Sequence, residues 1–214
     1  MDNINREYID VYINSLIKDD DEKLEVLRNE CLERQLPIIH KEVGQFIKLM
    51  IKQLNARSII EVGTNVGYSS IFMSNVMNNE GKVVTLERSE KFYQEAIENI
   101  KKFGLEKNIE VIYGDAVENL DNINGSFDMA FIDAAKSYYT TFFDKCCKMM
   151  KPGGMILSDN VLYQGMIATD DLVVRRKKTL VRNMREYLEY ISHDDRYVTS
   201  VLPLGDGLAI TLIK

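Results

Sequence analysis

Tryptophan, histidine, cysteine and proline are scarce in this sequence of 214 residues, which contains 0, 2, 3 and 3 of them respectively. With so few histidines, a zinc site built from histidine side chains is nearly excluded, and we expect His40 and His193 to be structural. Cys31, Cys146 and Cys147 form an odd set without the spacing of metal ligands. The adjacent pair suits a core helix in a reducing cytoplasm better than a disulfide framework.

Long hydrophobic runs are missing as well. The apolar stretches are far shorter than the roughly 20 residues that a membrane-spanning helix needs. The first ten residues, MDNINREYID, are too polar for a signal peptide. We therefore expect a cytoplasmic protein with no membrane partner. The net charge of -6 argues against strong non-specific binding of nucleic acid, although a local basic patch is compatible with it.

The overall composition and the pattern of apolar residues predict a folded α/β protein. Hydrophobic residues make up 45% of the chain and charged residues 28%, which allows a sizeable core and argues against widespread disorder. We expect a single domain over residues 1–214, with a helical extension over 1–55 and an α/β core over 56–214. In the extension, apolar residues recur at helical spacing in three segments. Either Asp20 or Asp21 is placed to begin the second helix as its N-cap.

From residue 58 the pattern changes to short apolar runs that alternate with amphipathic helices. Such alternation predicts a parallel sheet covered by helices on both faces. The first five predicted strands read SIIEV, KVVTLE, IEVIYG, FDMAFID and MILSD. A long helix near 171–192 precedes two further strands, YVTSVLPL and LAITLI, and the GDG between them predicts a hairpin. We therefore expect a mostly parallel, seven-stranded sheet that ends in an antiparallel pair.

The ends of the first three predicted strands carry residues that suit a nucleoside. The turn EVGTNVGYSS places Gly63 and Gly67 where the backbone approaches a ligand closely, with a spacing unlike that of dinucleotide sites. Glu87 ends the second strand, where an acid accepts hydrogen bonds from both ribose hydroxyls. Asp115 follows the third strand, in a position to recognise an adenine amino group. Taken alone, each of these acids serves equally well as a helix N-cap.

Acidic and amide side chains also end the fourth and fifth predicted strands. Asp133 is followed by two alanines and Lys136, and the next strand ends in Asp159 and Asn160. Oxygen ligands that converge with open positions suit Mg²⁺, and Lys136 is a candidate general base. Taken singly, these residues also fit an ordinary turn and a surface ion pair. Their occurrence together at neighbouring strand ends favours a metal site.

A basic stretch lies within the predicted helix near residues 171–192. Arg175, Lys178, Arg182 and Arg185 are spaced to share one face of that helix, away from its apolar face. Such a stripe, near the sheet edge that carries the candidate site residues, would hold the phosphates of a nucleic acid. A solvated helix face is the alternative.

In combination, EVGTNVGYSS, Glu87, GDA, FIDAAK and SDNVL resemble the class I, metal-dependent O-methyltransferases of the catechol and caffeoyl-CoA type. The resemblance covers nearly the whole chain. It implies a Rossmann-like class I methyltransferase fold, S-adenosylmethionine and Mg²⁺ (or Mn²⁺) as cofactors, and a homodimer to which the N-terminal helices contribute. It also implies metal ligation by Asp133, Asp159 and Asn160, catalysis by Lys136 and Asp133, and a cofactor pocket lined by Ile39, Gly63, Ser69, Glu87, Asp115, Ala116 and Asp133.

Within that family the chain is most similar to the bacterial tRNA 5-hydroxyuridine methyltransferases, through LPIIHK, FIDAAK, DNVLYQGMIA and the basic RRKK. We therefore expect methylation of 5-hydroxyuridine at the tRNA wobble position to 5-methoxyuridine, with the basic stripe holding the tRNA phosphates. A small-molecule catechol or caffeoyl-CoA substrate is the alternative, because catechol and 5-hydroxyuridine both present two vicinal oxygens to one metal ion. A cofactor-binding module without catalysis is disfavoured by the metal residues, and a dehydrogenase by the glycine spacing.

Overall fold

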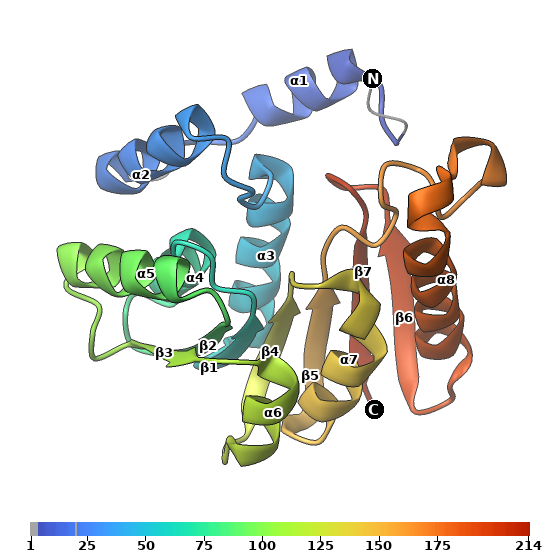
Figure 1. Ribbon diagram of the computed structural model, residues 1–214. Coiled ribbons are helices and arrows are strands. Elements are labelled where there is room, and N and C mark those ends of the chain that lie inside the picture. The colour runs from blue at the N-terminus through green and yellow to red at the C-terminus, as the bar shows by residue number, and fades with distance from the viewer. Residues whose placement is uncertain (1–3, 20) are drawn as a thin grey trace.

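The computed structural model describes residues 4–19 and 21–214, with a seven-stranded sheet through its middle (Figure 1). The strand order is β3-β2-β1-β4-β5-β7-β6. Strands β1 to β5 run parallel, whereas β7 is antiparallel to both of its neighbours. The strands are β1 (Ser58–Val62), β2 (Lys82–Glu87), β3 (Ile109–Tyr113), β4 (Phe127–Ile132), β5 (Met150–Ser158), β6 (Tyr197–Leu202) and β7 (Leu208–Ile213). The prediction of a mostly parallel sheet with a C-terminal antiparallel hairpin is confirmed.

Buried apolar runs form the strands where the sequence predicts them. In β1, four successive residues from Ile59 onward are buried, as expected for a strand covered on both faces. The strand ends agree with the predictions to within two residues, apart from the start of β5, which begins at Met150 rather than Met155. The extra residues are partly exposed and include two glycines, and Met150 pairs with Phe127 across an irregularity in the ladder. The sequence therefore did not predict this part of β5, because it is partly polar and contains two glycines.

Helices cover both faces of the sheet (Figure 1). On one face a core forms between the sheet and α2 (Glu22–Glu33), α3 (Lys41–Leu54), α4 (Tyr68–Val76) and α5 (Glu90–Phe103). On the other face a second core involves the short α6 (Ala116–Asn119), α7 (Tyr139–Cys147) and α8 (Lys178–His193). Alternate residues of β1 supply the two cores, because Ile59 belongs to the first, and Ile60 and Val62 belong to the second.

The N-terminal helix α1 (Glu7–Ser15) packs much less than its sequence pattern indicates. It contains no buried residue, and it lies along the upper edge of the molecule in Figure 1. Tyr8, Val11 and Tyr12 are 68%, 64% and 65% exposed. Asp21 is the N-cap of α2 and accepts a hydrogen bond from the Leu24 amide at 3.1 Å. The other candidate cap, Asp20, lies outside the described residues.

The prediction of one continuous helix near 171–192 was wrong for the first part of this segment. Two single turns of 3-10 helix, Asp170–Leu172 and Arg175–Lys177, precede α8. Val173 and Val174 between these turns have extended backbone angles, which interrupts the helix although its apolar spacing continues. Arg175 therefore lies outside α8. None of the described helices is long and apolar enough to cross a membrane.

Candidate active site

A cavity of about 500 Å³ opens at the carboxyl ends of the parallel strands. It lies where the strand order reverses, because the chain builds outward from β1 to β2 and β3, then returns to add β4 and β5 on the other side. Such switch points are the usual ligand sites of open α/β sheets. All predicted cofactor-pocket residues line the cavity: Ile39, Gly63, Ser69, Glu87, Asp115, Ala116 and Asp133. Lys136, Asp159 and Asn160 line it as well.

The turn between β1 and α4 brings its backbone against the end of β4. Gly63 has a φ of +107°, and a Cβ atom there would lie 2.1 Å from the carbonyl oxygen of Asp133. Only glycine permits both this backbone angle and this approach. The Asp133 amide in turn donates to the Val62 carbonyl at 3.0 Å. The turn after β1 and Asp133 are thereby held in one fixed arrangement.

Beneath this turn lies a fully buried carboxyl group, that of Glu61. It accepts hydrogen bonds from the hydroxyls of Ser69, Ser70 and Thr85. Burial raises the pKa of the Glu61 carboxyl to about 7, although the three hydroxyl groups oppose the rise. Because Ser69 also lines the cavity, Glu61 fixes the orientation of a cavity-wall hydroxyl.

The two acids expected at the nucleoside end of the cavity differ in their surroundings. Glu87 is 8% exposed, and its carboxylate accepts backbone hydrogen bonds from Asn65 at 2.7 Å and Ser89 at 2.8 Å. Asp115 is exposed and caps α6, accepting from the Val117 amide at 2.7 Å. The N-cap alternative is thus correct for Asp115, and its place on the cavity wall agrees with the ligand role too. The binding roles of both acids stay predictions.

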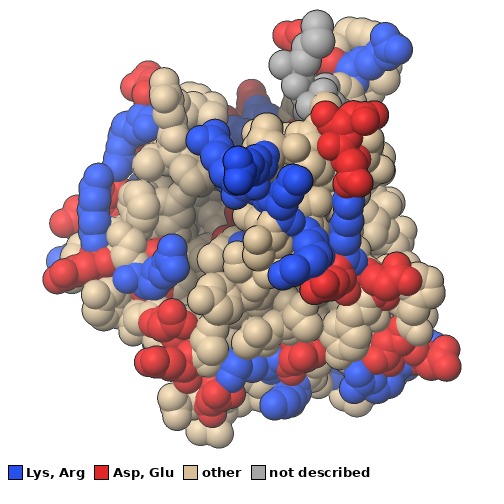
Figure 2. All heavy atoms as spheres, turned by 45° about the vertical axis from the view of Figure 1, so that its right-hand side comes forward, with Lys and Arg blue, Asp and Glu red and all other residues tan. Residues whose placement is uncertain are grey.

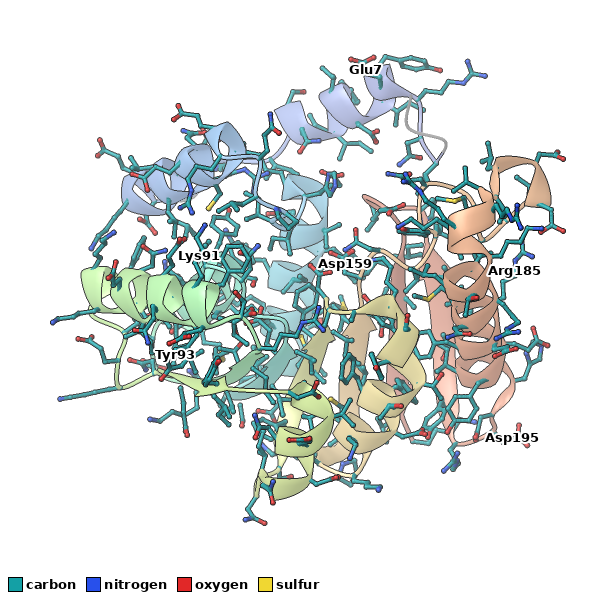
Figure 3. The ribbon with its side chains drawn as sticks, in the orientation of Figure 1. Glu7, Lys91, Tyr93, Asp159, Arg185 and Asp195 are labelled. Carbon is teal, nitrogen blue, oxygen red and sulfur yellow. The ribbon has the colours of Figure 1, made fainter. Side chains whose placement is uncertain are left out.

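Asp133, Asp159 and Asn160 come together at the ends of β4 and β5, which are adjacent as predicted. The Asn160 side-chain amide donates to Asp133 Oδ1 at 2.9 Å, and the Asn160 backbone amide donates to Asp159 Oδ1 at 2.8 Å. The Tyr139 hydroxyl donates to the Asp159 carbonyl oxygen at 2.7 Å and so anchors this strand end. Figure 3 shows Asp159 near the middle of the molecule. The predicted convergence of the three side chains is therefore present.

The electrostatics of this group suit a cation. Burial, and next the nearby charge of Asp133, raise the pKa of Asp159 well above its ordinary value. Burial also raises the pKa of Asp133, against the opposing effects of the Lys136 charge and the hydrogen bond from Asn160. Two crowded carboxylates fit a hard divalent ion, which would relieve their repulsion. Across residues 4–19 and 21–214, no three His, Cys, Asp or Glu side chains are grouped to hold a metal, so the Asn160 amide oxygen is needed as well.

Lys136 begins a single 3-10 turn, Lys136–Tyr138, on the cavity wall. Its Nζ lies 5.7 Å from the ring centre of Tyr163 and 6.0 Å from that of Tyr139. Lys177 Nζ lies 5.1 Å from the same Tyr163 ring. Lys177, which belongs to the basic segment 175–178, and Lys136, the candidate base, therefore lie near the same aromatic ring. The role of Lys136 as a general base stays a prediction.

The predicted basic stripe is only partly assembled. Lys178 and Arg182 are exposed on α8, and Arg182 lies 3.7 Å from Glu186. Arg185 points outward from α8 in Figure 3, where its guanidinium binds Asp170 at 2.8 Å and the Ile167 carbonyl at 2.9 Å. Arg175 lies before the helix. The four side chains therefore do not form one free helical face.

Comparisons with known proteins identify the family. A family described as O-methyltransferase matches residues 14–214. The chain belongs to this O-methyltransferase family. A catechol O-methyltransferase of Niastella koreensis is 29% identical over 97% of this chain and 97% of its own. Caffeoyl-CoA O-methyltransferase 2 of Petunia hybrida is 31% identical over 78% of this chain and 72% of its own.

Solved structures agree with this assignment. An O-methyltransferase from Bacillus cereus, in complex with SAH, matches with a TM-score of 0.84 at 30% identity, covering 97% of each chain. The present chain is therefore an S-adenosylmethionine-dependent O-methyltransferase of the catechol and caffeoyl-CoA type. The comparisons do not support the narrower resemblance to tRNA 5-hydroxyuridine methyltransferases.

Several cavity residues of the O-methyltransferase were missed by the sequence analysis. His40, expected to be only structural, lies on the cavity wall, as do Asn65, Arg88 and Phe92. Asn65 has a φ of +50°, and its side chain donates to the Pro37 carbonyl at 2.6 Å. These residues come from two loops, the N-cap of α3 and the first turn of α5, which meet only in the folded chain. The one available signal was Asn65 itself, inside a turn already singled out for its glycines.

Proposed function

We propose that this O-methyltransferase methylates one of two vicinal oxygens on a catechol-type substrate, with Mg²⁺ or Mn²⁺ in its active site. The observation that carries this proposal is the convergence of Asp133, Asp159 and Asn160 on the wall of the cofactor cavity. A protein that only bound the cofactor would have no need of three oxygen donors at that place. The catechol and caffeoyl-CoA relatives support the substrate class.

The roles of the individual side chains follow from the reaction. Methyl transfer from a sulfonium to an oxygen is an in-line displacement, which requires an oxygen held near attack distance and kept ionised. A bound divalent ion supplies Lewis-acid stabilisation of that negative charge. Asp133, Asp159 and Asn160 would hold the ion, and Glu87 would hold the ribose. Lys136, on the same cavity wall, would accept the hydroxyl proton.

A comparison of matched substrates tests this proposal. Purified protein would be incubated with radiolabelled S-adenosylmethionine, Mg²⁺ and either catechol, caffeoyl-CoA or phenol. We expect methylation of at least one of the two vicinal diols and none of phenol, which lacks the second oxygen. Equal methylation of phenol would contradict the requirement for paired oxygens.

A second candidate substrate is tRNA bearing 5-hydroxyuridine, and it is favoured by the basic segment 175–178. Lys177 and Lys136 both approach the ring of Tyr163, which places this segment beside the cavity. Figure 2 shows Lys and Arg side chains gathered next to a hollow in this face of the molecule. In a protein of net charge -6, such a local patch is where phosphates would bind.

Nucleoside mass spectrometry of tRNA from a strain lacking this protein separates the two candidates. Loss of 5-methoxyuridine with accumulation of 5-hydroxyuridine would favour the tRNA substrate, and unchanged tRNA would exclude it. Alanine at Arg175, Lys178 and Arg182 should then weaken tRNA binding and flatten its dependence on salt. The slope of the logarithm of the binding constant against the logarithm of salt concentration should fall by roughly 0.7–0.9 per lost phosphate contact. Alanine at Lys101 and Lys102, which are exposed on α5, is the matched control. Arg185 is left in place because it supports the neighbouring loop.

We also propose that α1 contributes to a homodimer. Tyr12 of α1 and Leu16, the C-cap residue of α1, are 65% and 66% exposed, and no residue of α1 is buried in the single chain. Light scattering after gel filtration should show a dimer, and serine at both positions should give a monomer. Serine at Val198, 55% exposed on β6, is the matched control and should leave the dimer intact. A monomeric wild type would contradict the proposal.

A further inference from the structure

The loop after β5 carries Asn160 and has an unusual backbone. Within six residues, Asn160, Tyr163, Gln164 and Gly165 have φ values of +58°, +44°, +55° and +79°. This left-handed conformation is costly for residues other than glycine, most of all for a bulky one such as Tyr163. A loop of this kind persists only where its surroundings over-determine it. Contacts from outside the loop must therefore hold it.

The turn between β6 and β7 supplies these contacts. The Leu162 amide donates to the carbonyl oxygen of Asp206 at 2.9 Å, and the Val161 amide donates to the carbonyl oxygen of Gly207 at 2.9 Å. The Gln164 amide donates to the side-chain carboxylate of Asp206. Asp206 thus binds the loop on both sides of Tyr163, once through its main chain and once through its side chain.

Glycines on either side of Asp206 allow this turn to fit tightly. A Cβ atom at Gly207 would lie 2.4 Å from Leu162 Cγ, and one at Gly205 would lie 3.0 Å from Val43 Cγ2. The turn is therefore wedged between the loop and the start of α3. The GDG sequence is accordingly needed for more than closing a hairpin, because a larger residue at Gly207 would displace the loop.

We propose that Asp206 is a positioning residue for the metal site. Its carboxylate holds the Gln164 amide, and this contact keeps the left-handed loop in the conformation that places Asn160 beside Asp133. The side-chain nitrogen of Asn160 then donates to Asp133 Oδ1 at 2.9 Å, and the amide oxygen of the same side chain would complete the ligand set. Asp206 acts through the loop and not as a ligand. This role rests on the proposed metal-dependent function.

Three substitutions separate the position of the Asp206 carboxylate from its charge. Asp206→Asn keeps an acceptor oxygen at the same place and removes the charge. Asp206→Glu keeps the charge and displaces the oxygens by one methylene group, and Asp206→Ala removes both. Asp195→Ala is the matched control, because Asp195 is exposed at the opposite end of β6 and lies far from Asp159 in Figure 3.

The primary measurement is Mn²⁺ affinity of the full chain, followed by the loss of the free-ion signal in electron paramagnetic resonance. We expect the Glu and Ala variants to bind Mn²⁺ roughly 10–100-fold more weakly than wild type, the usual effect of losing a residue that orients a ligand. The Asn variant and the Asp195→Ala control should bind like wild type. Affinity for S-adenosylmethionine, measured by calorimetry, should change little in all variants, which shows that they remain folded.

Two patterns would overturn the positioning role. Wild-type affinity for Mn²⁺ in all three Asp206 variants would show that the loop keeps its conformation without the Asp206 carboxylate. Equal weakening in the Asn and Ala variants, with wild-type affinity in the Glu variant, would assign the effect to charge and not to position. A wild-type protein that bound no Mn²⁺ would instead contradict the metal site itself, and Asp206 would lose this role with it.

Discussion

The Glu61 carboxyl group is fully buried and accepts hydrogen bonds from three hydroxyl groups, those of Ser69, Ser70 and Thr85. Its pKa of about 7 in the folded protein lies above the ordinary value of 4.5. The folded state therefore binds this proton more tightly than the unfolded state does. Its contribution to stability is complete below pH 4.5 and is lost as the pH rises through 7.

Replacement of Glu61 by Gln should reveal this dependence. The variant keeps the shape of the side chain but stays neutral, so it should be more stable than wild type above neutral pH by about 3 kcal/mol. The difference should shrink as the pH falls toward the ordinary glutamate pKa. Urea denaturation of both proteins across this pH range measures it. A difference that does not vary with pH would contradict the shifted pKa of Glu61.

Glu87 should matter for cofactor affinity more than for the chemical step. A charged hydrogen bond contributes about 1.5–3 kcal/mol, so Glu87→Ala should weaken S-adenosylmethionine binding by roughly ten-fold or more. Calorimetry measures this directly, with Glu110→Ala, an exposed position on β3, as the control. An unchanged dissociation constant would leave Glu87 only the backbone contacts to Asn65 and Ser89.

Among the structural elements, the turn after β1 depends most clearly on one glycine. Gly63→Ala should lower the free energy of unfolding by several kcal/mol, because the new Cβ would collide with the Asp133 carbonyl at the end of β4. Gly104→Ala is the matched control. Gly104 also has a positive φ, but a Cβ there meets no atom within 4 Å, so only the backbone cost of about 1–2 kcal/mol remains. Equal losses in the two variants would contradict a steric role for Gly63.

The elements that sequence predicts well are those defined by burial. β1 and β2 were placed correctly because each is a short apolar run whose residues are mostly buried. The segment before α8 could not be predicted in this way. Its apolar spacing continues the helical pattern, and its departure from helix is accompanied by a tertiary contact of Arg185 with Asp170 and the neighbouring carbonyl groups.

At the scale of the whole molecule, the predicted site follows from topology. Parallel strands bring their carboxyl ends to one edge, so Glu87, Asp133 and Asp159 were expected together before any contact was known. His40 reaches the same cavity from the segment before α3. This placement depends on tertiary packing, which no local sequence pattern predicts. The hydrogen bond from the Gln164 amide to Asp206 could not be predicted for the same reason.

The most direct test of this account is methyl transfer by metal-free protein. After treatment with a chelator and its removal, the protein should still bind S-adenosylmethionine but should not methylate catechol. Added Mg²⁺ or Mn²⁺ should restore the activity, and Asp159→Asn should resist restoration because one of the two carboxylates is gone. Full methyl transfer by the metal-free protein would contradict the central claim that Asp133, Asp159 and Asn160 hold a catalytic ion.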